Sequence, residues 1–206
     1  MKTDTELLNA ARRMDKDALV TIFDRYSPAL FNYVLRLCGD PVLADHIVGD
    51  VFARLVEHLS MGKGPDSNLR SYLFETTYHR LIDEARYAKR RAPLEETAFL
   101  RQDAYSGFLN VEDQVIYKQL LYALQHELTD DQRHVIFLRF LEEFSIRETA
   151  AILSKTVGHV KVIQNRAIEK LRTYLNYPTA RKAASSAGIA RVPKTRESLI
   201  PVSDRV

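Results

Sequence analysis

The feature that most constrains the fold is a pair of helix-start signatures in the second half of the chain. Thr129 is followed three residues later by Gln132, and Ser145 is followed in the same way by Glu148. In such a pair the hydroxyl accepts a hydrogen bond from a backbone N–H of the first turn, and the amide or carboxylate reaches back to the start of the helix. The pattern therefore predicts one helix after Thr129 and a second, shorter helix after Ser145.

Apolar residues at helical spacing define the inner faces of these helices and of a third. The helix after Thr129 is predicted to be mostly buried, as marked by Val135, Ile136, Leu138 and Phe140. The shorter helix is marked by Ile146, Thr149, Ala150, Ile152 and Leu153. A third helix, from Val157, is predicted to bury Val160, Ile163, Ala167, Leu171 and Tyr174. The polar residues 154–156 interrupt the pattern, so the last two helices are predicted to form a helix-turn-helix.

The third helix presents a polar outer face. Its apolar stripe turns Lys161, Val162, Asn165 and Arg172 away from the core, with His159 and Arg166 on the flank. In a helix-turn-helix the second helix enters the major groove, where Arg, Lys and Asn meet purine edges and phosphates and an apolar side chain meets a thymine methyl. We therefore expect duplex DNA to be contacted by His159, Lys161, Val162, Asn165 and Arg166.

A solvated helix in an ordinary bundle is the alternative, because charged outer faces are common. The overall net charge of +3 is too small to decide between the two. The local charge balance favours nucleic acid, since Glu169 is the single acidic residue between positions 154 and 182, against Lys155, Lys161, Arg166, Lys170, Arg172, Arg181 and Lys182.

Length and composition limit the fold class and the compartment. The chain has 206 residues, 46% of them hydrophobic, and only seven glycines, which with the long helical periodicity predicts an all-α protein. A single cysteine, Cys38, permits no internal disulfide and suits a reducing cytoplasm. No apolar run approaches the roughly 20 residues of a membrane helix, and the chain starts without a hydrophobic signal core. We expect a cytoplasmic protein that does not insert into a membrane.

Catalytic and metal-binding motifs are not evident in the sequence. The six histidines form no ligand-spaced set with cysteines. No phosphate-binding glycine loop follows a strand. We therefore expect no metal, no cofactor and no enzymatic activity.

The first half of the chain contains its own helical set. Residues 17–37 are predicted to form an apolar-rich helix or helix pair, with a kink or restart permitted at Pro28. Asp40 is placed to cap the next helix. Residues 60–68 form the clearest loop of the chain, and another helix is predicted over residues 69–88.

The helix over residues 69–88 has a polar and aromatic side that runs into a basic end. This side carries Tyr72, Thr76, His79, Asp83 and Arg86, and the end adds Lys89, Arg90 and Arg91. Such a stripe suits the stacking of unpaired bases while cations hold the phosphates. Tyrosines at the edge of a core, with cations that complement the helix dipole, explain the same pattern and stay open as the alternative.

These helical sets define the expected domains. Residues 1–91 form the first and residues 115–176 the second. The periodicity lapses over residues 92–114, which we expect to be a flexible linker. Residues 177–206 are expected to be a basic, flexible tail.

The order and spacing of the two domains resemble those of the extracytoplasmic-function sigma factors of bacterial RNA polymerase. Residues 44–55, from Ala-Asp-His to Ala-Arg-Leu, look like the polymerase-binding helix of that family. Residues 69–74 with Asp83 look like its minus-ten-reading helix, and residues 128–171 follow its minus-thirty-five-binding domain. The resemblance covers residues 15–176 and implies two small helical domains, a sigma region 2 bundle and a region 4 helix-turn-helix.

The resemblance also implies partners and contact residues. The polymerase-binding helix would dock on the clamp helices of the largest polymerase subunit through Asp45, Val48, Gly49, Asp50, Phe52 and Arg54. A flipped base of the minus-ten element would enter the loop over residues 61–68, with His79 beside it. The full minus-ten set would be Lys63, Asn68, Ser71, Tyr72, His79, Arg86, Lys89 and Arg90. The expected partners are core RNA polymerase, including its flap, and promoter DNA, with an anti-sigma factor as a further candidate.

Several positions depart from the family pattern. Tyr72 stands where Trp is usual, His79 where Asn is usual, Gly49 where Gln is common and Ser154 where Gly is frequent. Two other functions stay open. A transcriptional regulator would bind an operator through its second domain without being a polymerase subunit, and a helical adaptor would bind protein only.

Overall fold

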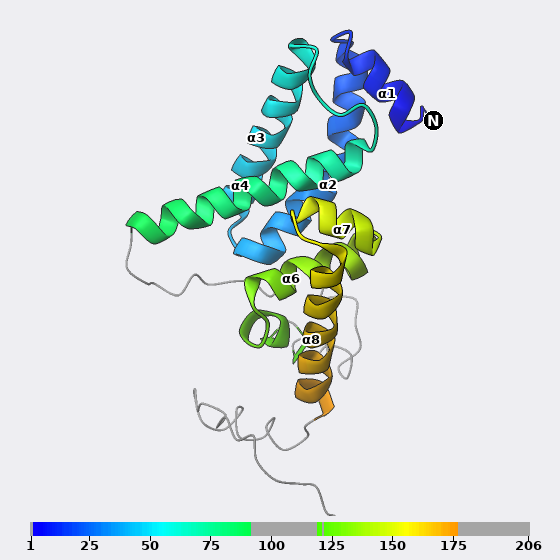
Figure 1. The fold of residues 1–206 in the computed structure, drawn as a ribbon. Coiled ribbons are helices and arrows are strands. Elements are labelled where there is room, and N and C mark those ends of the chain that lie inside the picture. The colour runs from blue at the N-terminus through cyan, green and yellow to red at the C-terminus, as the bar shows by residue number, and fades with distance from the viewer. Residues whose placement is uncertain (1, 92–118, 121, 177–206) are drawn as a thin grey trace, which may run out of the picture.

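The computed structural model describes residues 2–91, 119–120 and 122–176, without the side chains of residues 88–91 and 176. Its elements in chain order are α1 (Asp4–Ala11), α2 (Lys16–Cys38), α3 (Pro41–Ser60), α4 (Leu69–Arg91), α6 (Asp130–Ile136), η2 (Phe137–Leu141), α7 (Ile146–Ile152) and α8 (Val157–Asn176) (Figure 1). Residues 119–120 and 122–126 are also helical. The described residues contain no strand, which confirms the all-α prediction. The expected linker, 92–114, and tail, 177–206, lie outside the described residues.

The first lobe, residues 2–91, is built on α2 and α3, with α4 lying across both (Figure 1). α2 begins after Asp15, whose carboxylate accepts from the Ala18 N–H at 2.9 Å, and it ends at Gly39 in a left-handed conformation with φ 69°. Pro28 lies inside α2, so the permitted restart does not divide this helix. The core of the lobe includes the fully buried side chains of Ile22, Leu30, Ile47, Leu55, Leu69 and Leu73.

α1 lies outside the predicted helices, although it begins with the same kind of signature. The Thr3 hydroxyl accepts from the Glu6 N–H at 3.3 Å, and the Glu6 carboxylate accepts from the Thr3 N–H at 2.7 Å. Asp4 joins α1 to α2 through an ion pair with Arg25 at 2.6 Å and a hydrogen bond from the Tyr26 hydroxyl. Burial, reinforced by Asp4, raises the pKa of Tyr26 to about 12, so its hydroxyl remains a donor at neutral pH.

The second lobe, residues 119–176, contains both capping boxes that the sequence predicts. Thr129 and Gln132 exchange hydrogen bonds of 3.1 and 3.4 Å, and Ser145 and Glu148 exchange bonds of 2.7 and 3.2 Å. The apolar stripe of α8 is buried at Val160, Ile163 and Ala167 and becomes half-buried at Leu171 and Tyr174.

The segment after α6 differs from the prediction, because α6 continues as the π-helix η2. The Glu142 N–H donates to the Phe137 carbonyl at 3.0 Å, five residues back, so this turn is wider than an α-helical turn. Phe140 consequently faces outward, with 53% of its surface exposed, and Phe144 fills the core with 2% exposed. The prediction that Phe140 is buried is wrong.

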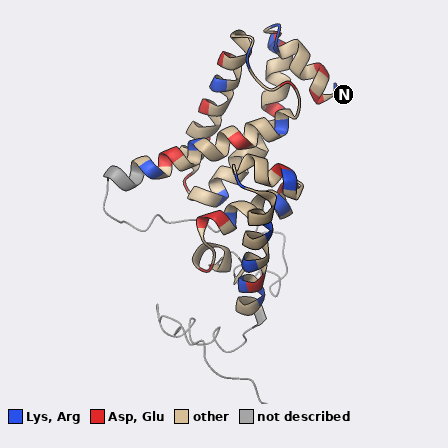
Figure 2. Cartoon of the chain, viewed as in Figure 1, with Lys and Arg blue, Asp and Glu red and all other residues tan. Residues whose placement is uncertain are grey.

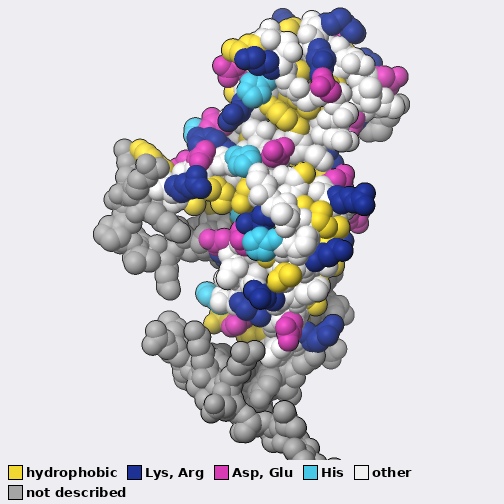
Figure 3. Space-filling view, viewed as in Figure 1, with side chains coloured by type: hydrophobic (Ala, Val, Ile, Leu, Met, Phe, Trp, Pro, Cys, Tyr) yellow, Lys and Arg dark blue, Asp and Glu magenta, His cyan; other side chains and the backbone are white. Residues whose placement is uncertain are grey.

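The two lobes are in direct contact through α2, α4, α6 and α7 (Figure 1). The Tyr33 hydroxyl of α2 and Nδ1 of His134 in α6 are hydrogen-bonded at 2.7 Å, and the Tyr78 ring of α4 meets the His134 ring edge-on at 4.9 Å between centroids. Buried residues form one continuous hydrophobic cluster through both lobes. Charged side chains of both signs are dispersed over the face seen in Figure 3.

Candidate functional site

The turn between α7 and α8 joins a helix C-cap directly to a helix N-cap. Ser154 is left-handed, with φ 52°, and its N–H donates to the Ala151 carbonyl at 3.0 Å, while the Lys155 N–H donates to the Ala150 carbonyl at 2.8 Å. These two bonds form the Schellman motif that ends α7. The Thr156 hydroxyl then accepts from the N–H of the third residue of α8 at 3.2 Å and starts that helix.

Side chains from neighbouring elements fix this helix-turn-helix. Lys155, in the turn, forms an ion pair with Asp131 of α6 at 3.0 Å. Arg139 of η2 donates to the Gln164 side chain of α8 at 3.1 Å. Contacts with η2 and α6 therefore set the direction in which α8 presents its outer face.

The predicted DNA-contact residues share that outer face. The side chains of His159, Lys161, Val162, Asn165 and Arg166 are all exposed. Lys and Arg recur along α8 (Figure 2). The arrangement places cationic, amide and apolar groups on one side of a helix, which is the combination that major-groove contacts require.

The predicted polymerase-contact residues of α3 divide into two groups. The side exposed to solvent, fully or in part, carries Asp45, Gly49, Asp50 and Arg54. Val48 and Phe52 are buried, with 4% and 8% exposed, because they lie on the face of α3 that packs into the first-lobe core. The expectation that Val48 and Phe52 contact a partner directly is therefore corrected, since they support α3 from inside.

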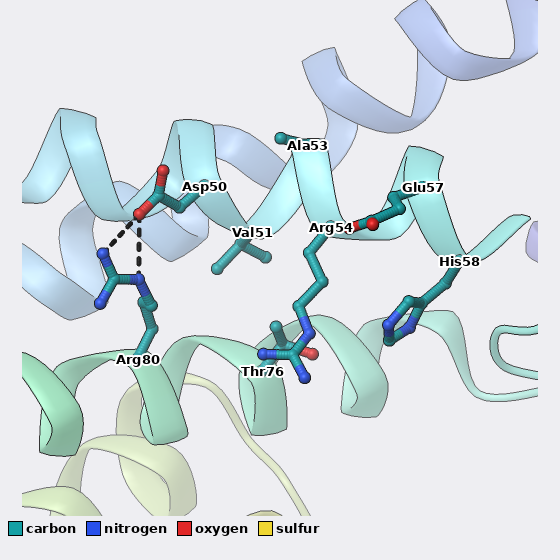
Figure 4. A pocket seen from close by; sticks show the side chains of 8 residues that line it. All are labelled: Asp50, Val51, Ala53, Arg54, Glu57, His58, Thr76 and Arg80. Carbon is teal, nitrogen blue, oxygen red and sulfur yellow. Dashed lines mark hydrogen bonds and ion pairs between the residues drawn. The ribbon is translucent and has the colours of Figure 1, made fainter. Parts of the chain in front are cut away.

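A groove of about 410 Å³ runs between α3 and α4 (Figure 4) and is lined by Asp50, Val51, Ala53, Arg54, Glu57, His58, Thr76 and Arg80. One Asp50 carboxylate oxygen accepts from Nε and Nη2 of Arg80 at 2.9 and 2.6 Å. Arg54 points across the groove toward Thr76 and forms no ion pair with any described residue. The groove thus offers one paired and one unpaired guanidinium.

The predicted minus-ten residues lie along the loop and α4. Lys63, Asn68, His79 and Arg86 are exposed, Ser71 and Tyr72 are half-buried, and the side chains of Lys89 and Arg90 lie outside the described residues. His79 does not lie beside the loop, because it follows Asn68 by roughly 16 Å along α4 at about 1.5 Å per residue. Its ring is 3.9 Å from the Glu75 carboxylate instead. The expected position of His79 is therefore corrected, and Tyr72 is the aromatic residue next to the loop.

Arg70 and His58 are candidate functional residues that the sequence pattern does not reveal. Arg70 donates to the carbonyl and carboxylate of Glu142 at 2.6 and 3.2 Å, and its guanidinium carbon lies 4.1 Å from the centroid of the Phe144 ring. Nδ1 of His58 is hydrogen-bonded to the Tyr72 hydroxyl at 2.8 Å. These contacts cross a loop or join the two lobes, so helical periodicity cannot signal them.

Two kinds of feature are absent from the described part of the chain. Its helices include none that is both long and apolar enough to cross a membrane. Among the same residues, no three His, Cys, Asp or Glu side chains gather as metal ligands would.

Known proteins match both lobes. The family model for Sigma-70 region 2 matches residues 22–91, and the model for Sigma-70, region 4 matches residues 125–173. The chain is 26% identical over 174 residues to the ECF RNA polymerase sigma factor BldN of Streptomyces coelicolor, with 82% of this chain and 65% of BldN covered. It is 26% identical over 159 residues to the ECF RNA polymerase sigma factor SigX of Bacillus subtilis, with 75% of this chain and 81% of SigX covered.

A solved structure shares the fold. The sigma factor RpoE in complex with the anti-sigma factor NepR from Bartonella quintana matches with a TM-score of 0.61 at 23% identity, over 77% of this chain and 96% of that chain. Region 2 and region 4 thus occur here in the order and with the helical architecture of the named relatives. The chain belongs to the extracytoplasmic-function sigma factors of bacterial RNA polymerase.

Proposed function

We propose that this chain binds core RNA polymerase and directs it to promoters, supplying promoter recognition while the polymerase supplies catalysis. The observation that carries the proposal is the presence, in one chain, of a helix-turn-helix with an exposed cationic face and a separate helical lobe with the region 2 pattern. Neither feature alone distinguishes a sigma factor from an operator-binding regulator. Their combination favours the sigma factor, which acts in the cytoplasm and does not insert into a membrane.

Polymerase binding is assigned to the outer side of α3. Asp45, Asp50 and Arg54 offer charge partners to the clamp helices of the largest subunit. Gly49 leaves room for close approach, since beyond its own stretch of helix no atom lies within 4 Å of where its Cβ would be. Asp50 is already paired with Arg80, so its carboxylate would be shared between Arg80 and a partner cation. Arg54 is the cation on this side without an ion-pair partner among the described residues. The second lobe would contact the polymerase flap.

Minus-thirty-five binding is assigned to α8. The exposed Lys161, Asn165 and Arg166 meet the requirement for base and phosphate contacts in the major groove, with His159 and Val162 beside them. Because Gln164 is held by Arg139, the helix enters the groove in a fixed orientation.

Minus-ten recognition is assigned to the loop over residues 61–68 and the adjoining start of α4. Here Lys63, Asn68, Ser71 and Tyr72 lie close in sequence, and Tyr72 offers a half-buried ring for stacking. Flipping a base costs a few kcal/mol, which a pocket and stacking of about 1–3 kcal/mol per base offset. His79 and Arg86, farther along α4, would contact positions beyond the flipped base.

An anti-sigma protein is proposed as a regulator. RpoE, which shares the fold, was crystallised with the anti-sigma factor NepR. The exposed side of α3 is the surface for which such a protein and the polymerase would compete.

Run-off transcription tests the proposal. Purified core polymerase is incubated with genomic promoter fragments, with and without this chain, and discrete transcripts should depend on the chain. Arg54→Glu should abolish them by weakening core binding, whereas Arg13→Glu, on an exposed residue that follows α1, should not. Specific duplex binding without core polymerase binding would instead establish an operator-binding regulator.

A further inference from the structure

His58 makes two kinds of contact that meet at the proposed minus-ten site. It lies in the last turn of α3, whereas Tyr72 lies in the first turn of α4, and the loop over residues 61–68 connects the two helices. Nδ1 of His58 and the Tyr72 hydroxyl are 2.8 Å apart, and the two rings are tilted by 58° with centroids 6.3 Å apart. This side-chain bond therefore joins the two ends of the loop.

The backbone around His58 holds the first half of the same loop. The Lys63 N–H donates to the His58 carbonyl at 2.8 Å, and the Gly62 N–H donates to the Leu59 carbonyl at 3.0 Å. Gly64 packs so closely on the helix end that an added Cβ would lie 3.2 Å from a Leu59 methyl carbon. One residue of α3 thus anchors the loop through its carbonyl and the aromatic ring through its imidazole.

We propose that His58 is a positioning residue for promoter melting, which holds the loop over residues 61–68 and the Tyr72 ring in the arrangement that receives an unpaired minus-ten base. The proposal rests on the proposed sigma function. His58 itself does not contact DNA; it acts through Tyr72 and Lys63. Since α3 is also the proposed polymerase-binding helix, the bond connects that helix directly to the Tyr72 side chain of the minus-ten site.

The hydrogen-bonding groups of His58 and Tyr72 are complementary. Burial raises the pKa of Tyr72, so its hydroxyl keeps its proton at neutral pH. Neutral His58 with the proton on Nε2 accepts that hydroxyl at Nδ1, and protonated His58 donates from Nδ1 to the phenolic oxygen. The backbone carbonyl of Tyr72 also accepts from the Thr76 hydroxyl at 2.8 Å, within α4. Without His58 the ring regains rotamer freedom that binding must then remove.

The test uses holoenzyme assembled from full-length chain and core polymerase. The probe is a fork-junction DNA from a promoter identified by run-off transcription, with a single-stranded non-template minus-ten segment, and a copy in which that segment is abasic. The measured quantity is the ratio of affinities for the two DNAs. Core binding and thermal unfolding are measured for each variant.

His58→Leu and Tyr72→Phe should each lower this ratio roughly three- to tenfold, the range expected for the loss of one hydrogen bond. The double variant should lose no more than either single variant, because both changes break the same bond. His58→Asn, which keeps a polar group near the Nδ1 position, should restore most of the ratio. Core affinity should stay unchanged, as it should in the control His126→Leu in the second lobe.

Other outcomes distinguish a failure of the proposed minus-ten site from a failure of the proposed role of His58. If Tyr72→Ala leaves the ratio unchanged, Tyr72 does not read the minus-ten strand and the proposed minus-ten site is wrong. If Tyr72→Ala lowers the ratio but His58→Leu does not, the minus-ten site stands and the role of His58 is overturned. A ratio that falls with His58→Leu but is not recovered by His58→Asn, together with a lower melting temperature, would also overturn it by showing a merely structural role.

Discussion

Ser154 bears the conformational strain of the turn that orients α8. It is left-handed, with φ 52°, in the position that closes the Schellman motif of α7. For a residue with a Cβ this conformation costs about 1–2 kcal/mol, which explains why glycine is frequent at this position in the family that the chain resembles. The turn keeps its shape here because Lys155 pairs with Asp131 and the Thr156 hydroxyl accepts from the His159 N–H.

Ser154→Gly should stabilise the protein. Relief of the left-handed strain outweighs the larger chain entropy of glycine in the unfolded state. The free energy of unfolding should therefore rise by about 0.5–1 kcal/mol and the melting temperature by about 1–4 °C. Thermal unfolding followed by circular dichroism measures the effect. Ser60→Gly, at the right-handed end of α3, is the control and should lower stability or leave it unchanged. Equal shifts for both variants would count against strain at Ser154.

Arg166→Ala should weaken binding to minus-thirty-five duplex DNA by about 1–3 kcal/mol, because a base-contacting arginine contributes discrimination of that size. The side chain is exposed on the outer face of α8, so the fold should be unaffected. Gel shift with duplex DNA and circular dichroism provide the two measurements. Arg13→Ala removes the same charge from the first lobe and serves as the control; equal affinity of the Arg166 variant and the parent chain would exclude the contact.

Single residues also show where sequence reasoning succeeds and where it stops. The outer face of α8 follows from helical periodicity, so its exposed residues are predicted correctly. The expectation for Val48 and Phe52 rests on resemblance to a motif, which carries no information on which face of α3 is buried. The pairing of His58 with Tyr72 depends on how the loop folds back, which no local pattern encodes.

At the scale of elements, a start signal is informative where a recognisable apolar stripe follows it. Thr3 and Glu6 supply the start signal of α1, but its apolar residues become recognisable as a stripe only where they pack against α2. The helical periodicity after Thr129 does not reveal the wider turn of the π-helix η2, so Phe140 is exposed where burial is expected, and Phe144 is buried. Local signals therefore locate helix beginnings better than they locate changes of register.

Arg70 supplies the polar contacts between α4 and the segment before α7, beside an aromatic contact of Phe74 with Phe144. Arg70 lies against the Phe144 ring and donates twice to Glu142, whose side chain is only 10% exposed. Burial raises the pKa of Glu142, although Arg70 and Arg36 oppose the shift. The carboxylate is thus partly desolvated and needs its cation.

Arg70→Ala and Glu142→Gln should therefore be coupled in a double-mutant cycle. The coupling free energy of unfolding is expected to be about 0.5–3 kcal/mol, measured by urea denaturation. Arg70→Ala combined with Asp45→Asn, on the exposed side of α3, should be additive. Additivity in the Arg70–Glu142 cycle as well would mean that the ion pair contributes nothing to holding the two elements together.

At the scale of the whole molecule, the contact between the lobes conflicts with simultaneous promoter binding. Elements centred at minus ten and minus thirty-five are about 25 base pairs apart, or roughly 85 Å along B-DNA at about 3.4 Å per base pair. In the structure Tyr72 lies only two residues after Arg70, which makes the lobe contact, and α8 is about 30 Å long. The proposed function therefore requires the lobes to separate when the promoter is bound.

His134 makes this separation sensitive to pH. Burial between Tyr33 and Tyr78 lowers the pKa of His134 to about 4 from an ordinary value of 6.5, and exposure to solvent when the lobes part should return it toward that ordinary value. In the closed arrangement, in which the two lobes are in contact, His134 binds fewer protons between pH 6.5 and 4 than when the lobes are apart. The stability that the closed arrangement gains from neutral His134 is therefore complete above pH 6.5 and is lost as pH falls toward 4. The remaining charges near His134 belong to the second lobe: Asp130, Asp131, Arg133 and Lys155.

Lowering the pH from 7.5 to 5 should raise the ratio of open to closed molecules roughly thirtyfold, given the two pKa values of His134. The raised pKa of Glu142 acts in the opposite direction, since protonation of its carboxyl favours the closed arrangement. It reduces the effect most at the lower end of this pH range.

Single-molecule energy transfer between dyes measures the ratio of open to closed molecules. The dyes are attached to cysteines introduced at the exposed Val42 and Arg172, in a Cys38→Ser background, and circular dichroism verifies that the helices persist. His134→Gln keeps a hydrogen-bonding group for Tyr33 but does not titrate, so the ratio in this variant should no longer rise on acidification. An equal rise in the variant and the parent chain would show that other groups open the lobes.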